Sequence, residues 1–289
     1  MVNNNLSDET VKSYDYDIKS YFDFLKNRYS FNEKSDICKL LEMTHETDIV
    51  MYLQFCKMEL NNSDITINRK LSAIRKLYGQ LYNNKTIPYN FAANVPHIKT
   101  QQNVHRIFSI DECKELFESI EGKNKYRDTS ILMMFLFCGM TVEEACNIKC
   151  NDIDGEYIYL RKNGEIKRKV VLNDALKSIL SRLFINERIS ANENLFTTQN
   201  GTPINKRTVH QLTVKHLSRA GMYSKGMTSE TLRKTGAYFL IHYGGIDSAQ
   251  IKSYFGGSDK GDTKYFASSS CEIDENVFNK IPLAKMKIE

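Results

Sequence analysis

The sequence predicts a mainly α-helical protein of two domains, with one small antiparallel β-sheet in its second domain. Apolar residues at helical spacing dominate the N-terminal third of the chain. A polar stretch over 95–105, without clear period and without an acidic residue, then interrupts this pattern. Two β-rich runs around an Asn-Gly turn occur only beyond it. We therefore expect a helical domain over 1–94, a linker over 95–106 and a mixed domain over 107–289, because 289 residues suffice for two cores.

Three amphipathic helices account for the first domain. Apolar side chains spaced by three and four residues place these helices over 10–25, 46–59 and 64–82. Ser7 is the expected N-cap of the first helix, and Asp8 and Glu9 place negative charge in its first turn. A run of turn-forming residues that ends at Pro88 follows the third helix and prevents it from continuing.

The third helix has an unusually basic polar face. After Asp64 it carries no acidic residue, and its basic residues are Arg69, Lys70, Arg75 and Lys76. Such a face is either simply solvated or in contact with phosphates. The missing carboxylates favour the phosphate-contacting alternative, because nothing on the same helix neutralises these charges.

The second domain mixes helices with one hairpin. Ser109 is the expected N-cap of a helix over 110–120. Further helices are expected over 127–138, 141–148, 173–184, 205–220, 229–243 and 247–254. Strands over 155–161 and 166–172 flank a turn at 162–164, since Asn-Gly between β-rich runs is a strong hairpin signal.

Composition excludes several classes of protein. Seven cysteines without CxxC spacing argue against disulfides and zinc, and favour small buried side chains in a reducing cytoplasm; Cys146 and Cys150, four residues apart, would share a helix face. The N-terminus has no secretory signal, and the apolar run over 131–138 is too short to span a bilayer. We expect no metal, no cofactor and no membrane partner. The net charge of +5 fits a nucleic-acid partner without establishing one.

Motifs along nearly the whole chain resemble the tyrosine recombinases of the phage integrase family. Residues 66–78 resemble the family's DNA-facing helix, and 138–153 are similar to its Thr-Gly-Leu-Arg-x-x-Glu segment. Residues 228–240 resemble the helix that opens with His-x-x-Arg, and 254–266 resemble the Leu-Gly-His stretch that leads to the nucleophilic tyrosine. The resemblance implies an N-terminal helical core-binding (SAM-like) domain, a C-terminal domain of the tyrosine-recombinase catalytic type, double-stranded DNA as partner and no cofactor.

The positions that carry the family's chemistry depart from its pattern. These enzymes attack a phosphodiester with a tyrosine hydroxyl, and two arginines with a His or Trp stabilise the charge of the transition state while a hairpin lysine protonates the leaving oxygen. By resemblance the six positions fall on Thr141, Lys162, Glu230, Arg233, Gly257 and Phe266. Only Lys162 and Arg233 keep the family's residue type, and Tyr265, one residue before the nucleophile's position, is the alternative nucleophile. Loss of one such donor costs about 3–4 kcal/mol of transition-state stabilisation.

We therefore expect a protein that binds DNA and has lost strand cleavage, acting as a sequence-specific transcriptional repressor or regulator of a phage or mobile element. The alternatives are a divergent but active site-specific recombinase, which cuts with Tyr265 or gains missing groups from a neighbouring protomer, and an accessory or bridging DNA protein. Arg233 has two candidate roles, phosphate contact and a structural ion pair with Glu230 one turn before it.

The resemblance also implies how the chain holds DNA and other copies of itself. The two domains are expected to close around duplex DNA as a clamp. The expected DNA contacts are Arg69, Lys70, Arg75, Lys76, Lys162, Arg207, Arg233, Lys234 and Lys264. An apolar stripe of Ile273, Val277, Phe278 and Ile281 marks the tail, which in the family docks on the adjacent protomer, so a homo-oligomer on DNA is expected.

Overall fold

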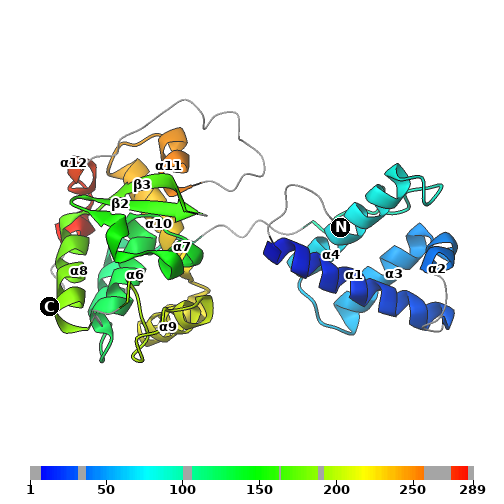
Figure 1. Ribbon diagram of the computed structural model, residues 1–289, viewed down its shortest axis with the longest axis horizontal. Helices are drawn as coiled ribbons and strands as arrows, with labels where there is room; N and C mark the ends of the chain where they lie inside the picture. Colours follow the sequence, from blue (N-terminus) through cyan, green and yellow to red (C-terminus); the bar gives the residue numbers. More distant parts are fainter. Residues whose placement is uncertain are drawn as a thin grey trace. The chain divides into compact units, whose positions relative to one another are not determined.

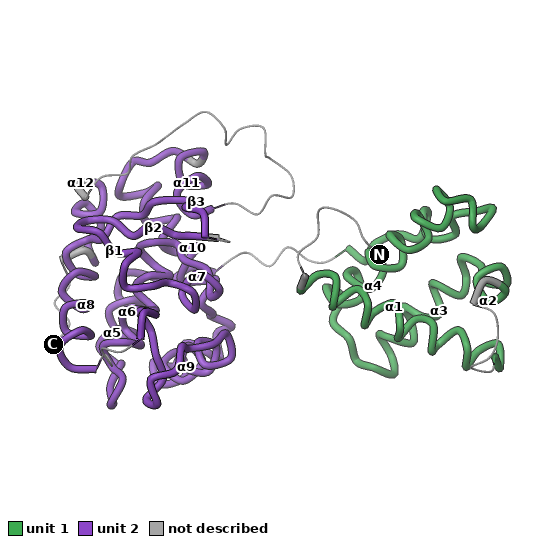
Figure 2. Tube along the Cα trace, viewed as in Figure 1, with its two compact units in different colours: residues 1–103 green, residues 104–289 purple. Residues whose placement is uncertain are grey.

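The computed structural model consists of two compact units, Met1–Asn103 and Val104–Glu289 (Figure 2). The structure describes residues 8–31, 37–99, 106–162, 164–187, 192–256 and 275–285. These residues are mostly helical, and the second unit holds a three-stranded antiparallel sheet of order β1-β2-β3 (Figure 1). The predicted fold class is confirmed. Within the described residues, no helix combines the length and the apolar character needed to cross a bilayer.

Unit 1 packs its helices around a core rich in tyrosine. Its helices are α1 (Asp8–Tyr29), α2 (Ile37–Met43), α3 (Glu46–Met58) and α4 (Asp64–Asn83). Tyr21 of α1 makes an edge contact with Tyr52 of α3, with ring centroids 5.1 Å apart, and shares a hydrogen bond of 3.1 Å with the hydroxyl of Tyr78 on α4. The predicted apolar stripes therefore form one core. The sequence did not predict α2, because its seven residues are too few to display a helical period.

The chain leaves unit 1 later than the sequence predicted. The side-chain amide of Asn68 on α4 donates to the Ile98 carbonyl and accepts from the Ile98 N–H, both at 2.9 Å. Val95 is buried in the core of unit 1. The first residues of the expected linker are thus bound to α4.

Unit 2 is built around one helix that is buried over almost its whole length. Its elements are α5 (Ile110–Glu118), α6 (Lys125–Phe137), α7 (Val142–Asn147), β1 (Ile153–Asp154), β2 (Tyr157–Lys162), β3 (Glu165–Val171), α8 (Asp174–Asn186), α9 (Lys206–Arg219), α10 (Ser229–His242), α11 (Ser248–Phe255) and α12 (Glu275–Phe278). Three short 3₁₀ turns, η1 (Cys150–Asp152), η2 (Tyr223–Lys225) and η3 (Pro282–Lys285), complete the described part. The central helix is α6, which packs against α8 and α10 (Figure 1). Packing against these two helices therefore holds both ends of α6 in place within the unit.

The structure agrees with the predicted hairpin of unit 2 and differs from the prediction for the cysteine pair. The strands β2 and β3 lie where the Asn-Gly signal placed them, with an irregularity in their pairing between Leu160 and Arg161. The two-residue strand β1 was too short to be predicted. The expectation that Cys146 and Cys150 share a helix face is wrong, because α7 ends at Asn147 and Cys150 lies in η1.

The tail packs on its own unit in this chain. The Phe278 ring is fully buried, with its centroid 6.4 Å from that of Phe137 and 6.0 Å from that of Tyr254. Ile281 and Leu283 are buried as well. Of the predicted stripe, Ile273 lies outside the described residues; the described part is covered within the same unit.

The contact between α6 and α10 depends on a glycine and yields a prediction. A Cβ on Gly236 would lie 1.7 Å from the Leu136 carbonyl oxygen, so Gly236→Ala forces α10 away from the buried helix α6. We expect this variant to lower the free energy of unfolding by about 1–3 kcal/mol or more, measured by urea denaturation. The matched control is Gly79→Ala in α4, where the nearest atom is 4.0 Å from the new Cβ, and a gain of about 0.5–1 kcal/mol is expected. Equal stability of the two variants would contradict this account.

Candidate functional site

Two arginines from distant parts of unit 2 meet at one backbone carbonyl. Arg168 of β3 donates from Nη2 to the Gly139 oxygen at 3.1 Å, and Arg233 of α10 donates from Nε to the same oxygen at 2.7 Å. Gly139 directly follows the end of α6 and has a φ of +56°, and a Cβ there would lie 2.2 Å from the Phe255 ring. Only glycine fits this turn. We call Gly139, Arg168 and Arg233 the arginine site.

Arg168 is fully engaged by the protein. It forms a two-bond ion pair with Glu144, from Nε at 3.1 Å and from Nη2 at 2.9 Å. Its Nη1 donates to the carbonyls of Cys138, at 3.0 Å, and Tyr254. A guanidinium has five N–H groups, and each is accounted for by these bonds together with that to Gly139. Since the side chain is also only 8% exposed, Arg168 has a structural task.

Neither partner of this ion pair was predicted from the sequence, although a signal for Arg168 existed. Arg168 lies two residues before Val170, which is fully buried, and pairs with the buried Leu160 across the hairpin. Alternate residues of a strand share a face, so Arg168 points to the core and its neighbours Lys167 and Lys169 do not. Finding Glu144 would have required knowing which helix packs against that face.

Arg233 has N–H donors that make no hydrogen bond to the described residues. Its Nη2 donates to the Phe255 carbonyl at 2.7 Å, and its Nη1 donates to Glu230 Oε2 at 3.1 Å. One further N–H on each Nη makes no hydrogen bond within the described part of the chain, and the side chain is 16% exposed. The predicted ion pair with Glu230 is thus present, and the guanidinium can still receive an anionic oxygen.

Thr141, at the position that resembles the family's first arginine, caps a helix. Its hydroxyl accepts from the Glu144 N–H at 3.2 Å, and its own N–H donates to Glu144 Oε2 at 2.7 Å. Burial raises the pKa of the Glu144 carboxyl, but the hydrogen bonds and charge of Arg168, with the bonds from Thr141, outweigh it, so the net pKa lies below the ordinary value. Position 141 therefore orders the start of α7 and supplies no cation.

The remaining residues of the predicted catalytic and DNA-binding set lie at the edge of the described residues or outside them. Lys162 ends β2 and pairs along the backbone with Glu165, while its side chain is not described. Gly257, Lys264, Tyr265 and Phe266 lie outside the described residues. Their assignments stay predictions.

The basic face of α4 is largely used inside unit 1, which corrects the prediction for Lys70. Lys70 is 3% exposed, and its Nζ lies 3.3 Å from Asp17 Oδ1 and 3.3 Å from the Tyr52 hydroxyl. Arg69 also bonds to Asp17, and its side chain remains 38% exposed. The neutralising carboxylate comes from α1, so a search of α4 alone could not find it.

The other predicted DNA contacts differ in accessibility. Arg75 donates from Nε to the Ala92 carbonyl at 3.2 Å and from Nη2 to the Val95 carbonyl, which ties the segment after α4 to that helix. Lys76 is half-buried, and its side chain makes no hydrogen bond or ion pair among the described residues. Arg207 is exposed on α9, and Lys234 is half-buried on α10. Phosphate contact by Arg69, Lys76, Arg207 and Lys234 remains a prediction.

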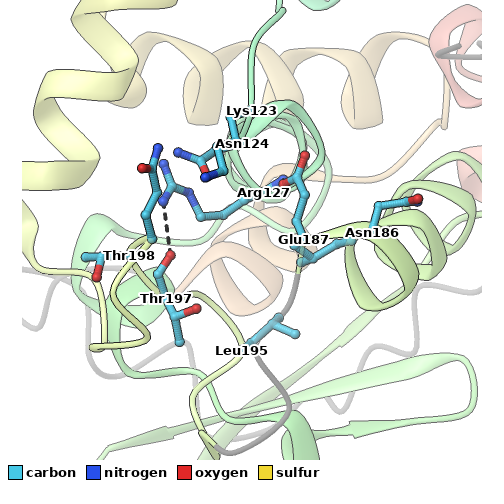
Figure 3. A pocket seen from close by; sticks show the side chains of 10 residues that line it. Lys123, Asn124, Arg127, Asn186, Glu187, Leu195, Thr197 and Thr198 are labelled. Carbon is cyan, nitrogen blue, oxygen red and sulfur yellow. Dashed lines mark hydrogen bonds between the residues drawn. The ribbon is translucent and has the colours of Figure 1, made fainter.

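A small cavity of about 190 Å³ lies at the N-terminal end of α6 (Figure 3). There the Glu187 carboxylate accepts from the N–H groups of Tyr126 and Arg127, both at 2.9 Å, and Arg127 Nη1 donates to the Thr197 carbonyl at 3.0 Å. The helix end thus already holds an anion from the protein. Because thirteen residues of helix extend about 20 Å, this cavity is separate from the arginine site. Among the described residues, no group of three or more His, Cys, Asp or Glu side chains could hold a metal ion.

The fold agrees with comparisons to known proteins. Residues 106–272 match the model of the phage integrase family, and residues 1–85 match that of the phage integrase N-terminal SAM-like domain. The chain therefore belongs to the phage integrase family. Unit 1 contains the SAM-like domain and unit 2 contains the domain of the catalytic type.

Curated relatives and solved structures extend the likeness to nearly the whole chain. A protein named tyrosine recombinase XerC, from Caldanaerobacter subterraneus subsp. tengcongensis, is 30% identical over 96% of this chain and 83% of its own length. Another of that name, from Thermodesulfovibrio yellowstonii, is 26% identical over 96% and 92%. A lambda integrase dimer bound to a COC′ core site has a TM-score of 0.67 at 16% identity, covering 93% of each chain. XerH recombinase in a post-cleavage complex with difH has a TM-score of 0.68 at 17% identity, covering 89% and 75%.

These relatives correct the main functional prediction. We expected a DNA-binding regulator that had lost strand cleavage, and that reading is wrong on this comparison, because the relatives that match along almost the full chain are named tyrosine recombinases. The alternative, an active site-specific recombinase, fits better. The departures at Thr141 and Glu230 do not by themselves establish a loss of activity.

The Glu144–Arg168 pair predicts how stability depends on pH. Because the pKa of Glu144 is depressed in the folded state, its contribution to stability is complete above the ordinary glutamate pKa of about 4.3 and is lost as the pH falls through the folded-state pKa. Glu144→Gln should lower the free energy of unfolding by about 1–3 kcal/mol at pH 7, with a smaller deficit below pH 4. Urea denaturation at several pH values measures this, with the exposed Glu115→Gln as control. A deficit that does not change with pH would contradict the assignment.

Proposed function

We propose that this protein is a site-specific tyrosine recombinase that binds double-stranded DNA and cuts it with Tyr265. The likeness to proteins named tyrosine recombinase, at 30% identity over 96% of the chain, supports the reaction class. In this reaction the tyrosine oxygen bonds to phosphorus as its proton passes to water, the bond to the 5′ oxygen breaks, and a phosphotyrosyl link and a free 5′-hydroxyl remain. Rejoining reverses these steps on a new strand end.

The observation that carries the proposal is the anchored guanidinium of Arg233. Two backbone carbonyls, from Gly139 and Phe255, hold it at 2.7 Å each, while one N–H on each Nη makes no hydrogen bond to the part of the chain that the structure describes. Negative charge develops on the nonbridging oxygens of the phosphate in the transition state, and donors already held in place stabilise that charge without reorganisation. The Phe255 carbonyl also fixes Arg233 to the end of α11, shortly before the segment that contains Tyr265.

The site needs further groups, which we assign as part of the same proposal. Lys162, next to the hairpin turn, protonates the 5′ oxygen as it leaves. Neither Thr141 nor Glu230 supplies positive charge, so we propose that a neighbouring protomer on the same DNA completes the cationic clamp. The lambda integrase structure contains a dimer bound to a core site, and a homo-oligomer on DNA is the corresponding assembly here.

The remaining DNA contacts are assigned to basic side chains of both units. We propose that Arg69 and Lys76 of unit 1, with Arg207, Lys234 and Lys264 of unit 2, contact phosphates as the chain closes around the duplex. Such contacts release counterions, so affinity falls steeply with salt concentration. As part of this proposal, the protein acts in the cytoplasm, bound to DNA.

A suicide substrate tests the reaction. A nick placed near the cut site of DNA recovered by selection with the purified protein lets the short strand diffuse away, and a covalent protein–DNA band then accumulates. We expect the band with the wild type and its complete loss in Tyr265→Phe, since the substitution removes the hydroxyl that we assign as the nucleophile. Tyr238→Phe, an exposed tyrosine of α10, should leave the band unchanged.

A double variant decides which register holds the nucleophile. If Tyr265 is correct, Tyr265→Phe combined with Phe266→Tyr stays inactive, because one residue along a helix turns a side chain by about 100°. A band restored by the double variant would assign the reaction to position 266. A wild type that binds DNA tightly and gives no band would overturn the proposed function.

The burial difference on α4 predicts two separate mutational effects. Lys76→Met should reduce the slope of log affinity against log salt concentration by about 1, with little change in stability. Lys70→Met should leave that slope unchanged and lower the free energy of unfolding by about 1–3 kcal/mol, because it removes a buried partner of Asp17. Salt titrations of DNA binding and urea denaturation measure the two effects. The reverse pattern would show that Lys70 reaches phosphate and that Lys76 is structural.

A further inference from the structure

Arg168 connects three segments that surround Arg233. Through its hydrogen bonds it joins the turn after α6, at Cys138 and Gly139, to the last turn of α11, at Tyr254. Its ion pair with Glu144 adds the first turn of α7. The guanidinium is 8% exposed and has no N–H left for a ligand, so any effect on the reaction must pass through its neighbours.

The neighbours of Arg168 are the groups that hold Arg233. The Gly139 carbonyl accepts from both guanidiniums, and the second anchor of Arg233, the Phe255 carbonyl, belongs to the residue after Tyr254. Arg168 therefore fixes one anchor directly and the other through the adjacent peptide. Among the described residues, the one side-chain acceptor of Arg233 is Glu230, which lies one turn earlier on the same helix. The direction in which its remaining N–H groups point depends on those two carbonyls.

Arg168 also removes a negative charge from the surroundings of the site. Glu144 lies at the start of α7, where it is bonded to the N–H of Thr141, two residues beyond Gly139. Left unpaired, this carboxylate would compete with a phosphate for the guanidinium of Arg233 and repel the phosphate. The two-bond ion pair with Arg168 neutralises it, and position 141 itself offers no cation that could do so.

We propose that Arg168 is a positioning residue for strand cleavage, which aims the guanidinium of Arg233 through the Gly139 and Phe255 carbonyls while neutralising Glu144. This inference rests on the proposed function, since it assigns a role within the same reaction. A lysine cannot replace Arg168, because one ammonium group cannot meet a carboxylate in two parallel bonds and reach three carbonyls as well.

Arg168→Lys tests the proposal through the single-turnover cleavage of the suicide substrate. A loss of folded protein lowers the final amount of covalent product, whereas a misplaced Arg233 lowers the rate constant with which that product forms. We expect the rate constant to fall by about 10- to 100-fold, with the Kd for DNA changed less than about threefold. The matched control is Arg161→Lys on β2, an arginine bonded to Asp152 and the Gly164 carbonyl, whose rate constant should match the wild type.

Hydrogen exchange measured by mass spectrometry tests the same role without any reaction. In Arg168→Lys, amide protection should fall over 138–144 and 254–256 and stay unchanged in unit 1. If Arg168→Lys does not fold, Glu144→Gln takes its place, and the same two segments should lose protection because one partner of the ion pair is gone.

The outcomes separate this inference from the proposed function. No covalent band from the wild type overturns the proposed reaction, and the exchange experiment then supports or overturns the positioning of the Gly139 and Phe255 carbonyls by itself. A wild-type band together with an unchanged rate constant in Arg168→Lys overturns the role of Arg168. Unchanged amide exchange over 138–144 and 254–256 in Arg168→Lys also overturns the role of Arg168.

Discussion

The arrangement of the arginine site depends on one carbonyl oxygen, that of Gly139, which accepts from Arg168 and Arg233 together. The oxygen is available to both because the chain turns through a left-handed glycine directly after the end of α6, with the Phe255 ring where a Cβ would be. The approach of α10 to α6 at Gly236 brings the first turns of α10 within reach of that oxygen. Close backbone packing between two buried helices therefore determines where a charged side chain near the surface is held.

In each unit a carboxylate pairs with basic side chains whose partner cannot be read from their own helix or strand. In unit 1 Asp17 accepts from Arg69 and Lys70, and in unit 2 Glu144 accepts from Arg168. A buried carboxylate without such partners would be strongly destabilising, so these cations are needed where they are. The number of positive charges available to DNA is accordingly smaller than the basic residues of α4 alone indicate.

The chain belongs to the phage integrase family although several of its site residues differ from the family's pattern. The family match covers the whole segment from 106 to 272, which includes Thr141 and Gly257, the residues predicted by resemblance to occupy two of the family's catalytic positions. Two N–H donors of the anchored Arg233 have no partner among the residues with described positions, and Thr141 caps α7. Departures at single positions indicated a loss of cleavage, but the likeness of the full chain to proteins named tyrosine recombinase does not support that loss.

The sequence by itself determined the longer helices, the hairpin and the fold class, and it singled out Arg233. Each of these follows from a local pattern: apolar spacing, an Asn-Gly turn, or a motif within one helix. Only the tertiary structure decided that Lys70 is buried, that Arg168 holds the arginine site and that the chain leaves unit 1 after Ile98. The reason is physical: periodicity reports which face of an element a residue occupies, whereas the partner on that face, such as Asp17 or Glu144, comes from a distant part of the chain.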